Sequence, residues 1–171
     1  MQADDVSEAS VVHRKSFSRQ SSSREWIEAN FNAFPKVIPY VAELDGQIAG
    51  YILWSQKSGF RPEVVLELEQ IAVHPAFRNK GVGKALIEDS LPQVRGQLSL
   101  QGSSLKHIIV TTRADNHAQE LYRKTLGVEI EAVIKNLYSD DEVFMVSRHL
   151  TRHSRNQKST GTDIINRLYP L

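Results

Sequence analysis

The sequence predicts a single α/β domain in which helices flank a mixed β-sheet. Two apolar runs are joined by Asp45-Gly46, the residue pair typical of a tight hairpin. A strand, a glycine turn, an amphipathic helix and a second strand then follow in order, which is typical of a parallel strand–helix–strand unit. A second hairpin follows this unit. Together these observations place parallel strands at the centre of the sheet and antiparallel pairs beside them.

Helices are expected before the first hairpin. One covers residues 7–17, and Ser22 or Ser23 would cap the second. The first hairpin joins strands over residues 40–44 and 48–54. These elements would supply the first part of the sheet and a helical layer over it.

The central unit starts with a strand over residues 64–73, which His74-Pro75 ends. Its helix runs from Val82 to about Leu100. Pro92 predicts a kink or an early end there, because proline removes a backbone donor. The elements expected next are a strand over 107–112, a helix over 115–126 ended by Gly127, and a hairpin of strands over 129–138 and 142–148.

The 171 residues favour one domain over residues 1–150, followed by a polar basic tail over 151–171 that ends in a short apolar segment. The net charge of +1, from 21 basic and 20 acidic residues, gives no indication of a nucleic-acid partner. The absence of cysteine excludes disulfides, thiolate nucleophiles and cysteine-based zinc sites, and no metal is expected. No basic stretch followed by an apolar run opens the chain, and no apolar run approaches ~18–20 residues, so a cytoplasmic protein without a membrane partner is expected.

The turn before the central helix reads Arg78-Asn79-Lys80-Gly81-Val82-Gly83. Glycines let a backbone approach a ligand closely and adopt positive φ. The first amides of a helix have no internal partners and, with the helix dipole, attract anions. Arg78, Lys80 and Lys84 add positive charge, so a pyrophosphate is the type of ligand that fits.

Two other glycine loops fail on their spacing. A P-loop needs a glycine where Arg78 stands and Ser or Thr where Ala85 stands. A dinucleotide fingerprint needs glycine or alanine at Leu86. A helix start with convenient glycines and no ligand remains the alternative for an isolated motif of this kind.

The motif and its surroundings resemble the GNAT superfamily of N-acetyltransferases over about residues 5–148. The family's cofactor motif, Arg/Gln-x-x-Gly-x-Gly/Ala, is matched by Arg78, Gly81 and Gly83. A second family motif places a capped helix after the next strand, and the residues at its spacings are Asp115, Ala118, Leu121 and Tyr122. The resemblance implies the acyl-CoA N-acyltransferase fold and acetyl-CoA as the acyl donor.

The resemblance also implies roles for single residues. Backbone groups of Ile71, Ala72 and Val73 would bond the pantetheine arm of acetyl-CoA as an added strand, where the central strands splay apart. The amides of Asn79, Lys80, Gly81, Val82, Gly83 and Lys84 would hold the pyrophosphate. Asp115 and Asn116 would lie near the far end of the arm, and Tyr122 near its sulfur.

Acyl transfer to an amine needs a neutral amine, a donor for the carbonyl oxygen and an acid for the leaving thiolate. The Val73 amide is the expected donor and Tyr122 the expected acid. The general base is expected to be Glu67, directly or through water, with Glu69 as the alternative; both would lie on one face of the strand. Solvent-facing carboxylates without a role, and a Tyr122 that merely packs, remain alternatives. Some family members carry a glutamate on the next strand, where Val110 stands here.

Two departures from the family pattern stand out. The first family strand is nearly missing, because only four residues precede Asp5. The apolar segment of the tail would fill that edge, within the chain or by exchange in a homodimer. Asp115 replaces the family's Asn and is still able to cap its helix.

The acceptor is expected to be a small-molecule or peptide amine. The residues Tyr138-Ser139-Asp140-Asp141 give a weaker similarity to protein N-terminal acetyltransferases of the ribosomal-protein type, and an aminoglycoside-like acceptor fits equally. A non-catalytic acyl-CoA-binding or regulatory module is the other function consistent with the sequence.

Overall fold

The computed structural model describes residues 1–148 and the backbone of residues 165–166. The remaining residues of the tail, and with them the expected domain boundary near residue 150, lie outside the described residues. The sheet has the strand order β5-β6-β4-β3-β2-β1-β7. Its strands are β1 (Val37–Leu44), β2 (Gln47–Gln56), β3 (Glu63–Val73), β4 (Ser104–Arg113), β5 (Glu129–Ile134), β6 (Glu142–Ser147) and β7 (Ile165–Asn166).

All neighbouring strands are antiparallel except β3 and β4, which are parallel. Helix α3 (Val82–Leu100) connects these two strands, and the short 3-10 helix η1 (Pro75–Phe77) precedes it. The mixed sheet with a central parallel unit, predicted from the order of elements, is therefore confirmed.

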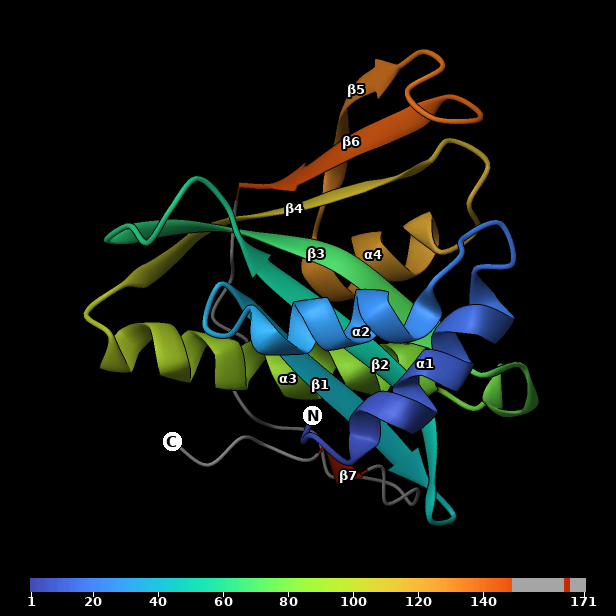
Figure 1. Cartoon of the computed structure of the whole chain (residues 1–171). Coiled ribbons are helices and arrows are strands. Elements are labelled where there is room, and N and C mark those ends of the chain that lie inside the picture. The colour runs from blue at the N-terminus through green and yellow to red at the C-terminus, as the bar shows by residue number, and fades with distance from the viewer. Residues whose placement is uncertain (149–164, 167–171) are drawn as a thin grey trace.

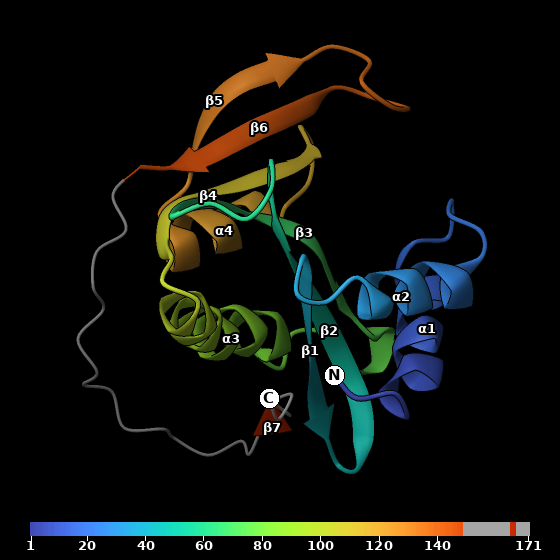
Figure 2. The same ribbon diagram turned by 60° about the vertical axis from the view of Figure 1, so that its left-hand side comes forward.

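Helices lie on both sides of the sheet (Figures 1 and 2). On one side, α1 (Asp5–Ser16) and α2 (Ser23–Asn32) cover a core that includes Tyr51 and Leu53 of β2. On the other side, α3 and α4 (Gln119–Leu126) cover a second core built around Trp54 and Leu86. The sheet is therefore buried on both faces at its centre, as expected for a parallel unit.

The first hairpin has the turn that its residues predict. Asp45 and Gly46 adopt φ of 53° and 72°, the left-handed region that both central residues of a type I′ turn require. Strands β1 and β2 pair from Leu44 and Gln47 to Val37 and Ser55. The turn thus fixes the register of the hairpin.

Four local predictions are wrong. Ser22 precedes α2 with φ of 52°, and neither it nor Ser23 caps the helix with its side chain. Helix α3 continues through Pro92 to Leu100, so the proline does not end it. Helix α4 begins at Gln119 rather than at Asp115, because the residues between form a turn. Strand β5 ends at Ile134, before the predicted residue 138.

The edge beside β1, where the sequence predicts a missing strand, carries β7. Ala42 pairs with Asn166 and Glu43 with Ile165, in antiparallel orientation. The structure therefore places the end of the chain against this edge within the same chain.

Candidate active site

Strands β3 and β4 separate halfway along their length. Their pairing runs from Glu63 and Ser104 to Glu67 and Ile109 and stops there, although β3 continues to Val73 and β4 to Arg113. Figure 1 shows the two ribbons diverging beyond this point. The splayed strands expected from the family resemblance are present at the centre of the sheet.

A bulge in β3 accompanies the separation. Leu53 of β2 pairs with Gln70, but the next residue, Trp54, pairs with Leu68, which leaves Glu69 as the extra residue. A bulge reverses the alternation of side chains along a strand. Accordingly Leu68 packs in the core under α3, whereas Ala72 packs in the core under α1 and α2.

Backbone groups of the last β3 residues face the opening. The His74 amide donates to the Ala49 carbonyl of β2 at 2.8 Å. Because the direction of backbone groups alternates along a strand, the Val73 and Ile71 amides point away from β2, toward β4. Ala72 faces β2 by the same alternation, which gives no support to the expectation that its backbone bonds the arm.

The Val73 carbonyl already has partners. It accepts from the Ser16 hydroxyl and from Arg78 Nε, each at 3.3 Å. Arg78 therefore folds back onto the end of β3 and anchors it. The Val73 amide, rather than its carbonyl, remains for an incoming ligand.

The turn between β3 and α3 presents a row of amides. Asn79 and Gly81 adopt φ of 61° and 81°, and Gly81 is the N-cap of α3. Within the described part of the chain, no backbone carbonyl accepts from the six amides of residues 79–84. Such a row at a helix N-terminus is an anion-binding arrangement.

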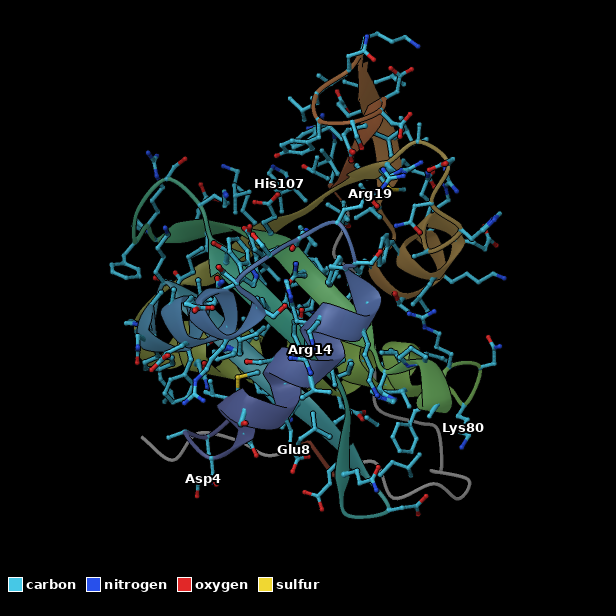
Figure 3. The ribbon with its side chains drawn as sticks, turned by 45° about the vertical axis from the view of Figure 1, so that its right-hand side comes forward. Asp4, Glu8, Arg14, Arg19, Lys80 and His107 are labelled. Carbon is cyan, nitrogen blue, oxygen red and sulfur yellow. The ribbon has the colours of Figure 1, made fainter. Side chains whose placement is uncertain are left out.

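The charges around this turn are exposed. Lys80 lies with its ammonium 5.2 Å from the centre of the Phe77 ring, and Figure 3 shows it at the outer surface of the turn. Lys84 lies 3.7 Å from Glu88, one helical turn on. Both ammonium groups are placed to attract a negatively charged ligand toward the amides.

Two glycines let α3 approach its neighbours closely. A Cβ on Gly50 of β2 would lie 2.7 Å from the Ala72 carbonyl oxygen, 3.1 Å from Leu86 and 3.2 Å from Val82. A Cβ on Gly83 would meet Leu121 of α4 at 3.5 Å and Val73 at 3.7 Å, which are ordinary contacts. Gly50 thus sets the distance between the start of α3 and the sheet, and Gly83 leaves room at the helix N-terminus.

The two predicted carboxylates share a lysine where β3 and β4 part. Lys57 Nζ lies 2.6 Å from Glu67 Oε2 and 3.8 Å from Glu69 Oε2. Thr111 of β4 donates to Glu67 Oε1 at 3.4 Å, so Glu67 bridges the two strands at the vertex of the opening. The carboxylates meet one ammonium despite the bulge, which agrees with their predicted common side.

The two carboxylates differ in environment. Burial raises the pKa of Glu69, and the neighbouring Glu67 charge raises it further, while Lys57 and Lys36 oppose the change. Glu67 has the short contact to Lys57 and the Thr111 donor. A carboxylate with a raised pKa is the stronger base of such a pair.

Tyr122 lies in α4, buried in the core cluster that α3 and α4 share. Burial raises its pKa to about 12. The hydroxyl therefore stays protonated at neutral pH, as an acid must be to donate to a leaving group.

The segment before α4 is held by side chains. Arg113 binds both carboxylate oxygens of Asp115, at 2.9 and 2.7 Å, so Asp115 does not cap the helix as predicted. Asn116 Oδ1 instead accepts from the Ala118 amide at 2.9 Å, and its amide nitrogen donates to Thr112 at 2.7 Å. Neither side chain is in contact with Tyr122 or the carboxylates, and their predicted role at the cofactor stays a prediction.

Two loops meet beside the opening. Arg19, in the loop between α1 and α2, donates to the Ser139 hydroxyl at 3.1 Å. Ser139 lies in the turn between β5 and β6, and Figure 3 shows Arg19 reaching toward this hairpin. The contact joins segments that lie 120 residues apart in the sequence.

Sequence reasoning missed Lys57, Thr111 and Ser16. Lys57 follows β2, and its amide bonds the Val65 carbonyl of β3 at 3.0 Å. The register between β2 and β3 would have placed it beside the carboxylates, but the bulge that sets this register has no signal in the sequence.

The geometry now stands beside what is known of other proteins. The sequence profile of the acetyltransferase (GNAT) family matches residues 7–128. The chain belongs to this family.

Similar proteins extend the comparison. The N-alpha-acetyltransferase of Sulfolobus acidocaldarius is 30% identical over 111 residues, which cover 60% of this chain and 62% of that protein. The match thus spans less than two thirds of the length of this relative. The crystal structure of the ribosomal-protein-S18-alanine N-acetyltransferase from Escherichia coli superposes with a TM-score of 0.68 at 16% identity, covering 91% and 96% of the two chains.

An aminoglycoside 6'-N-acetyltransferase solved in complex with coenzyme A superposes with a TM-score of 0.67 at 18% identity, covering 90% of this chain and 95% of that one. At these identities the two solved structures establish that this GNAT chain shares their fold. Among the described residues, no helix is long and apolar enough to cross a bilayer. The same residues hold no group of three or more His, Asp or Glu side chains placed to bind a metal.

Proposed function

We propose that this GNAT protein is an N-acetyltransferase that transfers the acetyl group of acetyl-CoA to a primary amine by direct attack. The observation that carries the proposal is the opening between β3 and β4, whose pairing ends at Glu67 and Ile109. An extended arm fits such an opening as an added strand. The six amides of residues 79–84 suit the pyrophosphate at the end of that arm.

The chain's own groups would hold the donor as follows. The Ile71 and Val73 amides face the opening and would bond the arm. Lys80, Lys84 and the row of amides would neutralise the pyrophosphate. When bound, the donor supplies an activated thioester, so the protein needs no covalent intermediate, in keeping with a sequence without cysteine.

The Ile71 amide is the better donor to the carbonyl oxygen. A strand rises about 3.3 Å per residue, so Val73 lies roughly 20 Å along β3 from Glu67, too far for both to serve one acetyl group. Ile71 is about 7 Å along the strand from Glu69. We therefore place the acetyl group beside Ile71 and the middle of the arm beside Val73.

The base and the acid follow from their surroundings. Glu67 and Glu69 both border the opening, and the raised pKa of Glu69 makes it the stronger base, directly or through water. Glu67 would then bind the incoming ammonium or relay its proton. Tyr122, protonated because burial raises its pKa to about 12, would donate to the departing thiolate.

The acceptor would be a cationic amine, as a small molecule or at the end of a peptide. Two carboxylates at the vertex of the opening favour an ammonium group before it loses its proton. The relatives named above act on protein N-termini and on aminoglycosides, as their names state. The cationic amine is what these acceptors have in common.

The test combines binding and turnover. Coenzyme A binding is measured by calorimetry, and thiol release from acetyl-CoA is followed with peptides, aminoglycosides and polyamines as acceptors. Tyr122→Phe is expected to lower kcat roughly 10²–10⁴-fold while coenzyme A still binds. Coenzyme A binding without turnover on any amine would instead favour a non-catalytic acyl-CoA-binding module, and an absence of binding would overturn both functions.

A further inference from the structure

A primary amine of the protein itself lies at the proposed catalytic carboxylates. Lys57 Nζ is 2.6 Å from Glu67 Oε2 and 3.8 Å from Glu69 Oε2. The same two groups are those that would take a proton from an external acceptor. Lys57 therefore occupies the place of an acceptor ammonium.

The backbone of Lys57 is fixed, but its side chain is not enclosed. The Lys57 amide donates to the Val65 carbonyl at 3.0 Å, which holds the residue beside β3. Its side chain is 41% exposed, so its rotamers are free to change. From Glu69 the proposed oxyanion donor, the Ile71 amide, is about 7 Å further along the strand.

We propose that Lys57 is a self-acetylation site, at which the acetyl group of bound acetyl-CoA passes to Nζ of the same chain; this rests on the proposed function. The Lys57 nitrogen forms a bond to the carbonyl carbon, and the bond from that carbon to sulfur breaks. One proton of the ammonium passes to Glu67 or Glu69 and then to water. A second proton ends on the sulfur, which gives free coenzyme A and an acetylated lysine.

The resting state makes this reaction slower than turnover of a good acceptor. The hydrogen bond to Glu67 raises the pKa of Lys57, so the amine is protonated until a carboxylate takes its proton. Acetylation would remove the positive charge and leave both carboxylates without their shared ammonium. The modification would thus change the protein as well as consume one donor.

Lys106 is a matched control. It pairs with Glu63 at 2.8 Å, its side chain is 45% exposed, and it lies at the opposite end of the same two strands, where they are still paired. Chemical acetylation by acetyl-CoA alone would modify the two lysines to a similar extent. Only transfer at the site would distinguish them.

The experiment incubates the full chain with acetyl-CoA that carries a deuterated acetyl group, without an acceptor, and follows Lys57 and Lys106 by peptide mass mapping. Lys57 is expected to react faster than Lys106 by roughly 10²–10⁴-fold, the range that a positioned base supplies. Its rate constant should not change with protein concentration. The double variant Glu67→Gln/Glu69→Gln should remove this excess and leave the Lys106 background.

Three outcomes would overturn the proposal. Equal rates at the two lysines mean chemical acetylation only. A rate constant that rises with protein concentration means transfer between molecules. An unmodified Lys57 in a protein that acetylates external amines refutes self-acetylation while the proposed function stands, whereas a protein that acetylates neither Lys57 nor any external amine refutes both.

Discussion

At the scale of single residues, the two carboxylates of β3 have unequal tasks. Glu67 is anchored by Lys57 at 2.6 Å and by Thr111 at 3.4 Å. Glu69 stands at the bulge, and burial, followed by the charge of Glu67, raises its pKa. The difference turns two similar residues of the sequence into a positioning group and a base.

This difference predicts a change in pH dependence. A base acts when deprotonated, so kcat/KM should rise with pH through the raised pKa of Glu69. Glu67→Gln removes the like charge that raises this pKa and frees Lys57 to approach Glu69, so the acid limb of the profile should move to lower pH. The measurement is kcat/KM against pH for the wild type and the variant.

Glu69→Gln is the companion variant, and it should lower kcat roughly 10²–10⁴-fold. If Glu67→Gln is the variant that loses this activity and Glu69→Gln keeps it, the roles are exchanged. Melting temperatures of both variants control for folding.

At the scale of elements, the start of α3 depends on a glycine in a neighbouring strand. Gly50→Ala would place a methyl group 2.7 Å from the Ala72 carbonyl oxygen and within 3.2 Å of Val82. We expect a loss of about 1–3 kcal/mol in the free energy of unfolding, as for overpacked cores, together with weaker coenzyme A binding. Urea denaturation and calorimetry measure the two effects.

Gly96→Ala is the control for that substitution. Gly96 lies exposed within α3, and no atom lies within 4 Å of a Cβ added there. Alanine should raise the free energy of unfolding by about 0.5–1 kcal/mol, because glycine is unfavourable inside a helix. If both substitutions destabilise equally, close packing at Gly50 is not the cause.

The N-terminus of α3 gives a second prediction at this scale. Gly83→Glu places a carboxylate among the amides proposed for the pyrophosphate, and like-charge repulsion should weaken coenzyme A binding by about 10²-fold or more. A negative charge in the first turn favours the helix itself, so folding should be kept. Gly83→Ala, whose Cβ makes only ordinary contacts, should bind nearly as the wild type, and unchanged affinity of the Glu variant would remove the pyrophosphate site.

At the scale of the whole molecule, the sheet is completed at its edge by the end of the chain. The backbone of Ile165 and Asn166 pairs with Glu43 and Ala42 of β1. This edge carries the strand opposite the β5–β6 hairpin, as Figure 1 shows. The hydrogen bonds of β7 therefore protect backbone groups that would otherwise form an open edge.

Removal of the residues after Arg148 tests this arrangement. We expect the free energy of unfolding to fall by about 1–3 kcal/mol, the value of the few backbone hydrogen bonds lost, with coenzyme A binding retained. Thermal unfolding and size-exclusion chromatography make the measurement. Unchanged melting would show that β7 contributes nothing, and a wild type that elutes as a dimer while the truncated chain elutes as a monomer would favour exchange between subunits.

The sequence by itself determined the order of the elements, the Asp45-Gly46 turn and the glycine turn before α3. These features depend on neighbours in the chain, through positive φ, periodicity and unpaired helix amides. Tyr122 and the carboxylate pair were also predicted from spacing, although their catalytic roles await experiment.

The tertiary structure decided what depends on pairs far apart in sequence. The bulge at Glu69, the end of pairing at Glu67 and Ile109, and the contact of Lys57 with both carboxylates follow from the fit of β3 between β2 and β4. The start of α4 moved to Gln119 because Arg113 holds Asp115 and Asn116 bonds Ala118. Local sequence sets which conformations a segment can adopt, but register and long-range partners select among them, and those partners decide where this protein places its charges.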